Sequence, residues 1–430
     1  MSILIENGSI VTVTEYNRVL EKAYLIIEDG KIKSIGTGAP PAGDYDKRID
    51  ATNRLVLPGF INAHTHAAMT LLRGYADDLP LKEWLETKIW PLEDQLCGED
   101  VYWGSMLAMT EMIKSGTTCF ADMYFFMEQT ARAVEQTGMR AVLSRGMVGL
   151  GPQAEEALED SRRLAGEWAG KGDGRITVML GPHAPYTCPP PYLQKVMDLA
   201  KELKVGLHIH IAETKGEFED IRRDYGRTPV AHLESLGLFE LPTIGSHCVY
   251  LTDEEIDILA RYKVGVAHNP ESNMKLASGI APVPQMLKAG IAVGLGTDGA
   301  SSNNNLDMLQ EMRSCAFLHK VNTLDPTALP AYQALEMATV NGAKALGLDH
   351  LGILAEGSQA DLILVSLEEA HMIPRYDLIA NLVYSAQAAD VQTVIINGRI
   401  VMEDRVIKTF DEQEVLERAK QAAQRLAGKG

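Results

Sequence analysis

The chain has 430 residues, of which 46% are hydrophobic and 23% charged, and its formal net charge at pH 7 is −18. This length permits a large core, and the acidic balance argues against nucleic acid or an acidic membrane as the main partner, because both would be repelled. The sequence has no run of 18 apolar residues and no signal-peptide pattern at its start, and its five cysteines are scattered, so we expect a cytoplasmic protein with reduced thiols and no membrane span.

Short β-strands are predicted at both ends of the chain. Within the first 57 residues, apolar runs alternate with the dipeptides Asn7-Gly8 and Asp29-Gly30, which are typical of tight hairpin turns. The same pattern returns at 357–367 and 391–404, where the turn is Asn397-Gly398. Because a lone hairpin is marginally stable in water, we expect both ends to combine into one small composite β-sandwich domain, formed by residues 1–57 and 352–430.

Residues 58–351 alternate between short apolar runs and helical patterns. Eight runs are each followed by a helix or a long loop, and they span 56–66, 117–124, 140–147, 176–187, 205–214, 243–251, 264–273 and 291–302. The stretch 99–116 has apolar spacing near 3.6 and ends in glycine, as a helix does. Eight βα units predict a (β/α)8 barrel of the TIM type. A doubly wound sheet is the alternative, but the glycine-rich turns that would favour it are missing.

Polar residues gather at the carboxyl ends of these predicted strands, where barrel enzymes carry their chemistry. Seven of the 11 histidines lie in the eight runs. His64 and His66 point to the same face, because residues i and i+2 of a strand do so. Together with His210 of the fifth run and Asp298 of the eighth, they form a nitrogen and oxygen donor set that suits Zn²⁺ or Fe²⁺. We therefore expect one divalent metal ion per subunit.

Other residues in the runs have a structural interpretation beside a functional one. Asp122 either supports the site or forms a salt bridge. His268 and Asn269 are expected in a hydrogen-bond network rather than at the metal. His208 is expected to be a packed barrel residue, and Cys248 a small buried thiol rather than a nucleophile.

Four segments resemble signatures of the amidohydrolase superfamily, and the resemblance covers nearly the whole chain. They are PGFINAHTH (58–66), HIHIAET (208–214), GSHCVYL (245–251) and GLGTDGASSNN (294–304). The resemblance implies metal-assisted attack of water on an sp² carbon, with His64, His66, His210 and Asp298 as ligands and Asp298 also as base. The fourth run ends in GPHAPYT and offers no lysine. Binuclear members use a carboxylated lysine there, so a single metal ion is implied, in the branch where deaminases are concentrated.

The residues around the predicted metal independently fit hydrolytic removal of an amino group. Attack on an amidine carbon of an aromatic ring needs one proton for the adjacent ring nitrogen and another for the leaving amine. Glu213 lies three residues beyond His210 and is the predicted general acid. Asp298 can accept the proton of the water, and His247 can orient the water and stabilise developing charge.

The segment 69–94 is too long for a simple βα connection, and we expect it to cover the mouth of the barrel. It carries Trp84, Trp90 and Glu93. An aromatic wall with a carboxylate suits a flat base attached to a sugar diol. The segment resembles the methylthioadenosine/S-adenosylhomocysteine deaminase family, which implies that Glu93 binds the ribose and that Trp84 lines the pocket. Trp90 has an equally good interpretation as a packing residue of the covering segment.

The same resemblance assigns further contacts. It implies that Arg145 meets a homocysteine carboxylate, that His183 contacts the nucleoside, and that Glu213 and Asp298 lie at the purine. A salt bridge at the barrel mouth is the alternative for Arg145. A second tail-binding arginine of that family would be Arg162, Arg163 or Arg175, among which the sequence does not choose.

The predicted function is metal-dependent deamination of adenine nucleosides, such as 5′-methylthioadenosine, S-adenosylhomocysteine, adenosine or 5′-deoxyadenosine, to the inosine analogue and ammonia. The alternative is a related hydrolase that acts on guanine, a pterin or a chlorinated triazine, and a third hypothesis is a non-catalytic scaffold that lacks metal. The expected partner is a small nucleoside, with neither nucleic acid nor membrane. Exposed barrel helices such as 99–116 could support a homo-oligomer.

Overall fold

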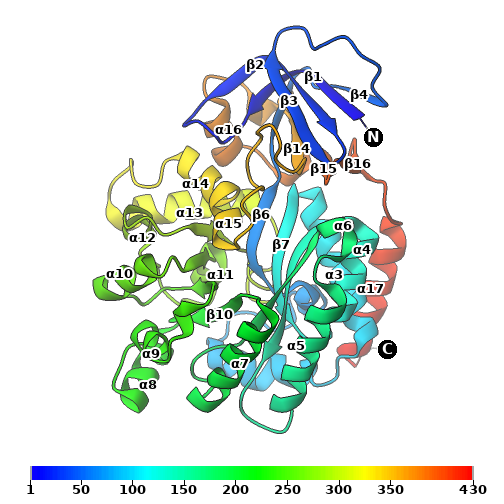
Figure 1. Ribbon diagram of the computed structural model, residues 1–430. Coiled ribbons are helices and arrows are strands. Elements are labelled where there is room, and N and C mark those ends of the chain that lie inside the picture. The colour runs from blue at the N-terminus through cyan, green and yellow to red at the C-terminus, as the bar shows by residue number, and fades with distance from the viewer. Residues whose placement is uncertain (1, 429–430) are drawn as a thin grey trace.

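Eight parallel strands from the middle of the chain lie side by side in chain order in the computed structural model, which describes residues 2–428 (Figure 1). They are β6 (Phe60–Thr65), β7 (Thr117–Tyr124), β8 (Arg140–Met147), β9 (Ile176–Pro182), β10 (Leu207–Ile211), β11 (Thr243–His247), β12 (Gly265–His268) and β13 (Val293–Leu295). Each strand lies within the apolar run predicted for it. The predicted TIM-type barrel is therefore confirmed.

The barrel closes where the chain leaves β13 and meets β6. The backbone N–H of Asp298 donates to the carbonyl of His64 at 3.0 Å, and that of Thr297 donates to Asn62 Oδ1 at 3.0 Å. A Cβ at Gly296 would lie 2.9 Å from the backbone nitrogen and oxygen of His64, so this close approach requires glycine. Closure thus places Asp298 directly beside His64.

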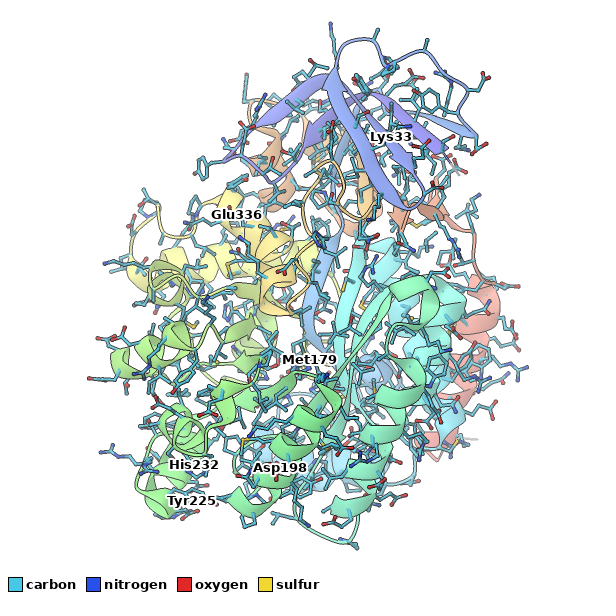
Figure 2. All side chains as sticks on the ribbon, viewed as in Figure 1. Lys33, Met179, Asp198, Tyr225, His232 and Glu336 are labelled. Atoms are coloured by element: carbon cyan, nitrogen blue, oxygen red, sulfur yellow. The ribbon has the colours of Figure 1, made fainter. Side chains whose placement is uncertain are left out.

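Helices cover the outside of the barrel. They include α3 (Gly98–Lys114), α4 (Met127–Thr137), α5 (Ala154–Trp168), α7 (Pro190–Leu203), α8 (Lys215–Tyr225), α9 (Pro229–Ser235), α10 (Asp253–Arg261), α11 (Pro270–Lys275), α12 (Val283–Lys288), α13 (Met308–Thr323), α14 (Ala331–Met337) and α15 (Val340–Ala345). Figure 2 shows Met179 of β9 near the middle of the barrel and Asp198 of α7 on the outer layer. Among residues 2–428, no helix combines the length and the apolar character that crossing a bilayer demands.

The two ends of the chain form one separate sheet, as predicted. Its strands are β1 (Ser2–Val11), β2 (Val19–Glu28), β3 (Lys31–Thr37), β4 (Lys47–Asp50), β5 (Arg54–Pro58), β14 (Leu362–Ser366), β15 (Val391–Ile396), β16 (Arg399–Glu403) and β17 (Val406–Ile407). Their order is β17-β16-β15-β14-β5-β1-β2-β3, with β4 paired to β1. The antiparallel pairing of β14 with β5 joins the two ends. The domain boundaries at 57/58 and 351/352 stay a prediction, and residues 1, 429 and 430 of the predicted domain lie outside the described residues.

One of the three predicted hairpin turns is wrong. Asp29-Gly30 and Asn397-Gly398 do join neighbouring strands, and all four residues have positive φ, as tight hairpin turns of this kind require. At Asn7-Gly8, however, β1 continues through the dipeptide, with Asn7 at φ 66° and a shift of register between Ile5 and Gly8. The dipeptide is a β-bulge, because a bulge also uses a residue with positive φ.

The C-terminal helix α17 (Glu412–Leu426) lies against barrel helix α3 rather than on the terminal sheet (Figure 1). Lys114 of α3 pairs with Glu412 at 2.7 Å, and Arg425 pairs with Asp100. A buried ion pair between Arg140 of β8 and Asp361, at 2.8 Å, joins the barrel to the terminal sheet itself. These contacts fix α17 against α3 and the terminal sheet at the amino end of β8.

Candidate active site

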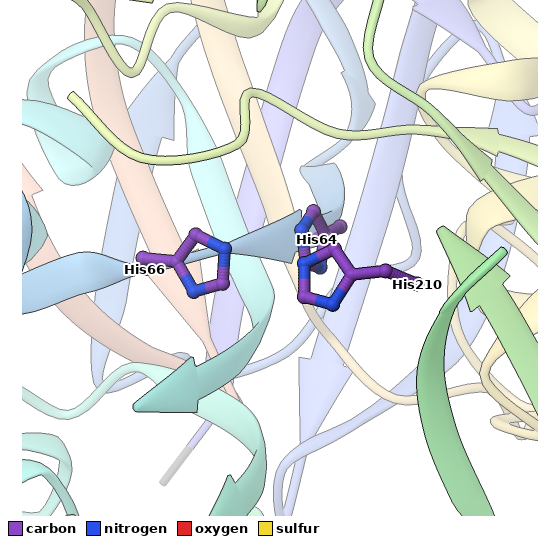
Figure 3. A group of neighbouring side chains, drawn as sticks. All are labelled: His64, His66 and His210. Carbon is purple, nitrogen blue, oxygen red and sulfur yellow. The ribbon is translucent and has the colours of Figure 1, made fainter. Parts of the chain in front are cut away.

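Four side chains predicted as metal ligands lie together at the carboxyl end of the barrel. Figure 3 shows the rings of His64, His66 and His210 turned toward one another, and ligand atoms of these three side chains lie within 4.8 Å of one another. Asp298 Oδ1 is 3.4 Å from His64 Nε2 and 3.2 Å from His66 Nε2. The structure therefore brings together residues from the first, fifth and eighth strand ends.

Each of the three imidazoles is fixed through its Nδ1 atom. His66 Nδ1 lies 2.6 Å from the carbonyl oxygen of Met123, and His210 Nδ1 lies 2.7 Å from that of His183. His64 Nδ1 lies 2.9 Å from His208 Nε2. A proton on each Nδ1 satisfies these bonds and leaves each Nε2 lone pair for the centre of the cluster, which is the arrangement that metal-binding histidines adopt.

Asp298 is oriented by two hydroxyl groups. Its Oδ2 accepts hydrogen bonds from Ser272 Oγ at 2.7 Å and Ser302 Oγ at 3.0 Å, so Oδ1 faces the histidines. Burial by itself would raise the pKa of Asp298, but the imidazoles of His64 and His66 beside it hold it well below its usual range. The side chain is therefore a carboxylate.

These residues fit a bound cation. Burial lowers the pKa of His64 to about 3, and its buried Nε2 makes no hydrogen bond of acceptable geometry among the described residues. Burial also opposes charge on His66, yet Asp298 beside it raises the pKa of His66 to about 9. A divalent ion is bound by neutral imidazole nitrogens that have a free lone pair and by carboxylates, and His64 Nε2 and Asp298 offer both.

Glu213 and His247 lie next to this cluster. Glu213 lies two residues after the end of β10, and the carboxylate of Glu217 accepts the backbone N–H groups of Ala212 and Glu213 at 2.9 Å each, which fixes the turn. His247 Nε2 lies 3.9 Å from Glu213 Oε2. Burial raises the pKa of Glu213, and the nearby His247 offsets only part of this effect. A carboxyl group that keeps its proton more readily than usual suits a general acid.

His247 is held from the opposite side. Its Nδ1 lies 2.9 Å from Asn273 Oδ1 and 3.3 Å from Asn269 Nδ2. Because an amide oxygen only accepts, a proton on Nδ1 satisfies Asn273 and leaves Nε2 directed toward Glu213 and the cluster.

A cavity of about 560 Å³ extends from the cluster to the mouth of the barrel. The predicted covering segment forms one wall, through α1 (Leu81–Trp84), η2 (Leu85–Ile89) and α2 (Trp90–Glu93). We call the end of the cavity beside the predicted metal ligands the metal end, and its lining includes His66, His183, His210, Glu213, His247 and Asp298. The lining toward the mouth includes Trp84, Trp90, Glu93, Tyr124, Phe125, Arg145, Val148, Leu150 and Tyr186. All the predicted substrate-binding residues therefore face one cavity.

The three predicted residues of the covering segment occupy different positions. Trp84 is 4% exposed and lies in the wall, whereas Trp90 is 42% exposed and lies at the rim. Glu93 accepts a hydrogen bond from the hydroxyl of Tyr124, with 2.7 Å between Tyr124 Oη and Glu93 Oε1. Burial raises the pKa of Glu93, and the bond from Tyr124 partly offsets this effect.

Arg145 forms the salt bridge expected as the alternative and also lines the cavity, and its contact with a tail carboxylate stays a prediction. Its Nε lies 3.4 Å from Asp160 Oδ2, which is a salt bridge at the barrel mouth. Its guanidinium also lies 5.2 Å from the centre of the Phe125 ring and lines the cavity. Asp160 binds Arg163 as well, at 2.7 Å.

The second tail-binding arginine is not found among its three candidates. Arg163 and Arg162 pair on the outside with Asp160 and Glu202. Arg175 is buried and donates to the carbonyls of Val134 and Met139. Among the described residues that line the cavity, Arg145 is the one arginine.

The residues with two interpretations take mainly structural positions. Asp122 Oδ1 accepts the backbone N–H of Ala67 at 2.7 Å, so it supports the turn that follows His66. Cys248 is fully buried, and burial raises the pKa of its thiol, which does not favour a nucleophile. His208 is more than a packed residue, because its Nε2 holds His64.

A second histidine group lies off the cavity. His268 Nε2 is 3.4 Å from His319 Nε2, and the thiol of Cys315 is close to both. All three side chains are fully buried and none lines the cavity described above. A proton on one Nε2 can be shared with the other, so the pair belongs to a structural network, as expected for His268.

Several residues of the site escaped the sequence analysis. Tyr124, Ser272, Ser302, Asn273 and Glu217 hold predicted residues in place, as described above. Tyr124 lies two positions after Asp122 at a strand end, and that spacing could have identified it. The serines and Asn273 lie in loops and short helices after β12 and β13, where no periodicity indicates direction.

The amino-acid sequence matches a known protein family and a protein of high sequence identity. The sequence model of the Amidohydrolase family matches residues 55–401. The chain is 67% identical over 431 residues to a protein of Syntrophomonas wolfei named 5-methylthioadenosine/S-adenosylhomocysteine deaminase, with 100% of both chains covered.

Two solved structures with bound zinc also match over nearly their whole length. An adenosine deaminase from Xanthomonas campestris has a TM-score of 0.94 and 35% identity, with 99% of this chain and 98% of that one covered. An atrazine chlorohydrolase from Arthrobacter aurescens TC1 has a TM-score of 0.91 and 25% identity, with 98% and 100% covered.

Proposed function

The chain belongs to the amidohydrolase family, and on this premise we propose that it is a metal-dependent deaminase of adenine nucleosides. It replaces the 6-amino group of the purine with oxygen from water and releases ammonia. The observation that carries the proposal is that one cavity has Glu213 beside the histidine cluster and Glu93 on the covering segment. A purine at the first carboxyl and a ribose at the second would span that cavity.

His64, His66, His210 and Asp298 would hold one divalent ion. Zinc is the favoured ion because it is bound in both solved relatives, and Fe²⁺ accepts a similar donor set. When bound, the ion supplies Lewis acidity that lowers the pKa of water toward about 7.

The protein side chains move the protons. Asp298 accepts a proton from the attacking water, and the protonated carboxyl of Glu213 donates one to the ring nitrogen next to the reacting carbon. The imidazole of His247 faces both groups and orients the water. The carbon–nitrogen bond then breaks, and the amine leaves as ammonia with the proton that Asp298 received. The hydroxyl proton on the attacked carbon returns to the carboxylate of Glu213 as the carbonyl forms. Water and the amino nucleoside thus give the oxo nucleoside and ammonia.

The outer part of the cavity fits a nucleoside better than a free base. About 560 Å³ exceeds the volume of a flat ring and leaves space for a sugar and a tail. Trp84 offers a flat wall, Glu93 accepts hydroxyl protons, and Val148 and Leu150 offer apolar surface to a methylthio group. Arg145 would meet a carboxylate on a longer tail, as in S-adenosylhomocysteine.

A related hydrolase that acts on guanine, a pterin or a chlorinated triazine is the second candidate. It is favoured by the similarity to atrazine chlorohydrolase, because the same cluster can serve dechlorination. The carboxylate of Glu93 distinguishes the two candidates, since none of these rings carries a sugar diol.

We also propose that the protein works in the cytoplasm. All five cysteines are free thiols, which supports a reducing compartment such as the cytoplasm. The oligomeric state stays a prediction.

The test is ammonia release by zinc-loaded protein from 5′-methylthioadenosine, S-adenosylhomocysteine, adenosine and 5′-deoxyadenosine, with metal content measured in the same batch. We expect turnover of at least one nucleoside, loss after chelation and recovery on adding zinc. Failure with all four nucleosides, or faster turnover of guanine or a chlorotriazine, would overturn the proposal.

A further inference from the structure

The hydroxyl of Tyr124 makes the hydrogen bond that fixes the carboxylate of Glu93. Tyr124 is the last residue of β7, 4% exposed, and Glu93 is the last residue of α2. Their oxygens are 2.7 Å apart. Among the residues that the structure describes, this is the one side-chain hydrogen bond that ties segment 81–94 to a barrel strand. The position of the carboxylate therefore depends on a rigid strand end as well as on the covering segment.

The direction of this bond follows from the charges. An ionised carboxylate only accepts hydrogen bonds, so the phenol of Tyr124 donates to Glu93 Oε1. Both side chains line the cavity, and among the described residues Tyr124 Oη and Glu93 Oε2 make no further hydrogen bond. Two neighbouring oxygens that both accept are complementary to two neighbouring hydroxyl groups that both donate.

We infer that Tyr124 is a specificity-determining residue, which together with Glu93 recognises the adjacent 2′- and 3′-hydroxyls of a ribose as one unit. The inference rests on the proposed function and names a residue that governs the choice of sugar. Without the phenol hydroxyl, the Glu93 carboxylate loses its fixed orientation, and the site loses Tyr124 Oη as an acceptor.

Packing alone is the competing explanation for Tyr124. Its ring lies 5.1 Å from the ring of Phe125 and 6.4 Å from that of His66, measured between centroids. Phenylalanine keeps these ring contacts and removes only the hydroxyl. The substitution Tyr124→Phe therefore separates recognition by the hydroxyl from packing by the ring.

The experiment measures kcat and KM for adenosine, 2′-deoxyadenosine and 3′-deoxyadenosine in the zinc-loaded full chain. We expect Tyr124→Phe to lower kcat/KM for adenosine about tenfold, mainly through KM, because a hydrogen bond to a charged group is lost. For the two deoxynucleosides, kcat/KM should change about threefold or less, since each lacks one of the two hydroxyls that donate to Tyr124 and Glu93. The preference for ribose over deoxyribose should therefore fall.

Tyr186→Phe is the matched control. Tyr186 lines the same cavity and is 40% exposed, and its ring lies beside His183 rather than Glu93. This variant should keep the ratio between adenosine and the deoxynucleosides. An equal loss for all three substrates in Tyr124→Phe, or an unchanged ratio, would overturn the inference.

A double-mutant cycle tests whether the two residues act as one unit. In a Glu93→Ala background, Tyr124→Phe should change the ribose preference about twofold at most, because coupled residues are not additive. Independent, additive effects would overturn the coupling. Glu93→Gln offers a second route, since its amide has one acceptor oxygen and should also reduce the ribose preference. If the unchanged protein releases no ammonia from adenosine or from any of the other three nucleosides, the proposed function fails. If it deaminates adenosine and the ratio survives in Tyr124→Phe, only the inference fails.

Discussion

The two ends of the cavity are built in different ways. At the metal end, His64, His66 and His210 come from strands or their immediate ends, and each Nδ1 is bonded to a carbonyl or to another buried ring. At the mouth, Trp84, Trp90 and Glu93 come from a covering segment that, within residues 2–428, one side-chain hydrogen bond ties to a barrel strand. The difference teaches that the metal end is fixed by the barrel itself, whereas the mouth can vary without changing the barrel.

The electrostatics of the two ends differ as well. The metal end gathers buried imidazoles around the carboxylate of Asp298, and burial lowers the pKa of His64 to about 3 and of His183 to about 4. The mouth offers mainly apolar surface, with Glu93, Asp94 and Arg145 as the charged residues of its lining. Changes at the metal end should therefore affect all substrates alike, and changes at the mouth should affect the choice among them.

Loss of the general acid gives the largest expected effect. Glu213→Gln keeps the shape and removes the proton, so kcat should fall about 10²- to 10⁴-fold for every nucleoside, while bound metal stays near one ion per chain. Steady-state ammonia release and elemental analysis measure both quantities. Glu219→Gln on the exposed face of α8 is the control and should match the unchanged protein. A loss confined to one nucleoside would mean that Glu213 belongs to substrate selection instead.

Removal of the ring that holds His64 comes second. His208→Ala takes away the acceptor for His64 Nδ1, and we expect metal affinity to fall about 10- to 100-fold, because partners of metal ligands orient them. Zinc retention against a series of chelator concentrations measures the change. His350→Gln, at an exposed position, is the control. Unchanged retention in His208→Ala would show that the strand backbone alone orients His64.

The third prediction concerns the mouth. Glu93→Ala should lower kcat/KM for adenosine about tenfold or more, because charge-assisted hydrogen bonds to the sugar are lost, and should change that for the free base adenine about twofold at most. Glu83→Ala removes an exposed carboxylate from the same segment and should have no effect. Equal losses for nucleoside and base would contradict the role of Glu93 at the ribose. They would also mean that a residue at the mouth affects all substrates alike, as residues at the metal end should.

The same contrast explains what the sequence could predict. Strand ends and the i, i+2 rule place His64 and His66 on one face, and the closure of eight strands brings Asp298 to them. These are consequences of barrel geometry, so a sequence pattern suffices. The structure brings the four side chains together, and their role as ligands stays a prediction that the metal analysis tests.

Features that depend on irregular segments were beyond the sequence. The bond between Tyr124 and Glu93 joins residues 31 positions apart, and it exists only because the covering segment folds back over β7. The pairing of Asp160 of α5 with Arg145 of β8 likewise depends on how α5 packs against the barrel. The Asn7-Gly8 bulge has the same local sequence signal as the two true turns, so only the pairing of neighbouring strands distinguishes them.

The smallest expected effect is a pH dependence that belongs to the mouth alone. Burial raises the pKa of Glu93 above its usual 4.5; Tyr124 and His66 oppose this shift, and Asp94 adds to it. An acid with a raised pKa loses its carboxylate form at a higher pH than usual, so recognition of the sugar should weaken as the pH falls. The ratio of kcat/KM for adenosine to that for 2′,3′-dideoxyadenosine isolates this effect, because titration at the metal end cancels between the two substrates. We expect the ratio to fall about threefold between pH 8 and pH 5.5, as a weakened hydrogen bond predicts. In Glu93→Ala the ratio should be flat over this range. A flat ratio in the unchanged protein would mean that Glu93 stays ionised throughout or does not contact the sugar, and an equal slope in Glu93→Ala would assign the titration to the metal end.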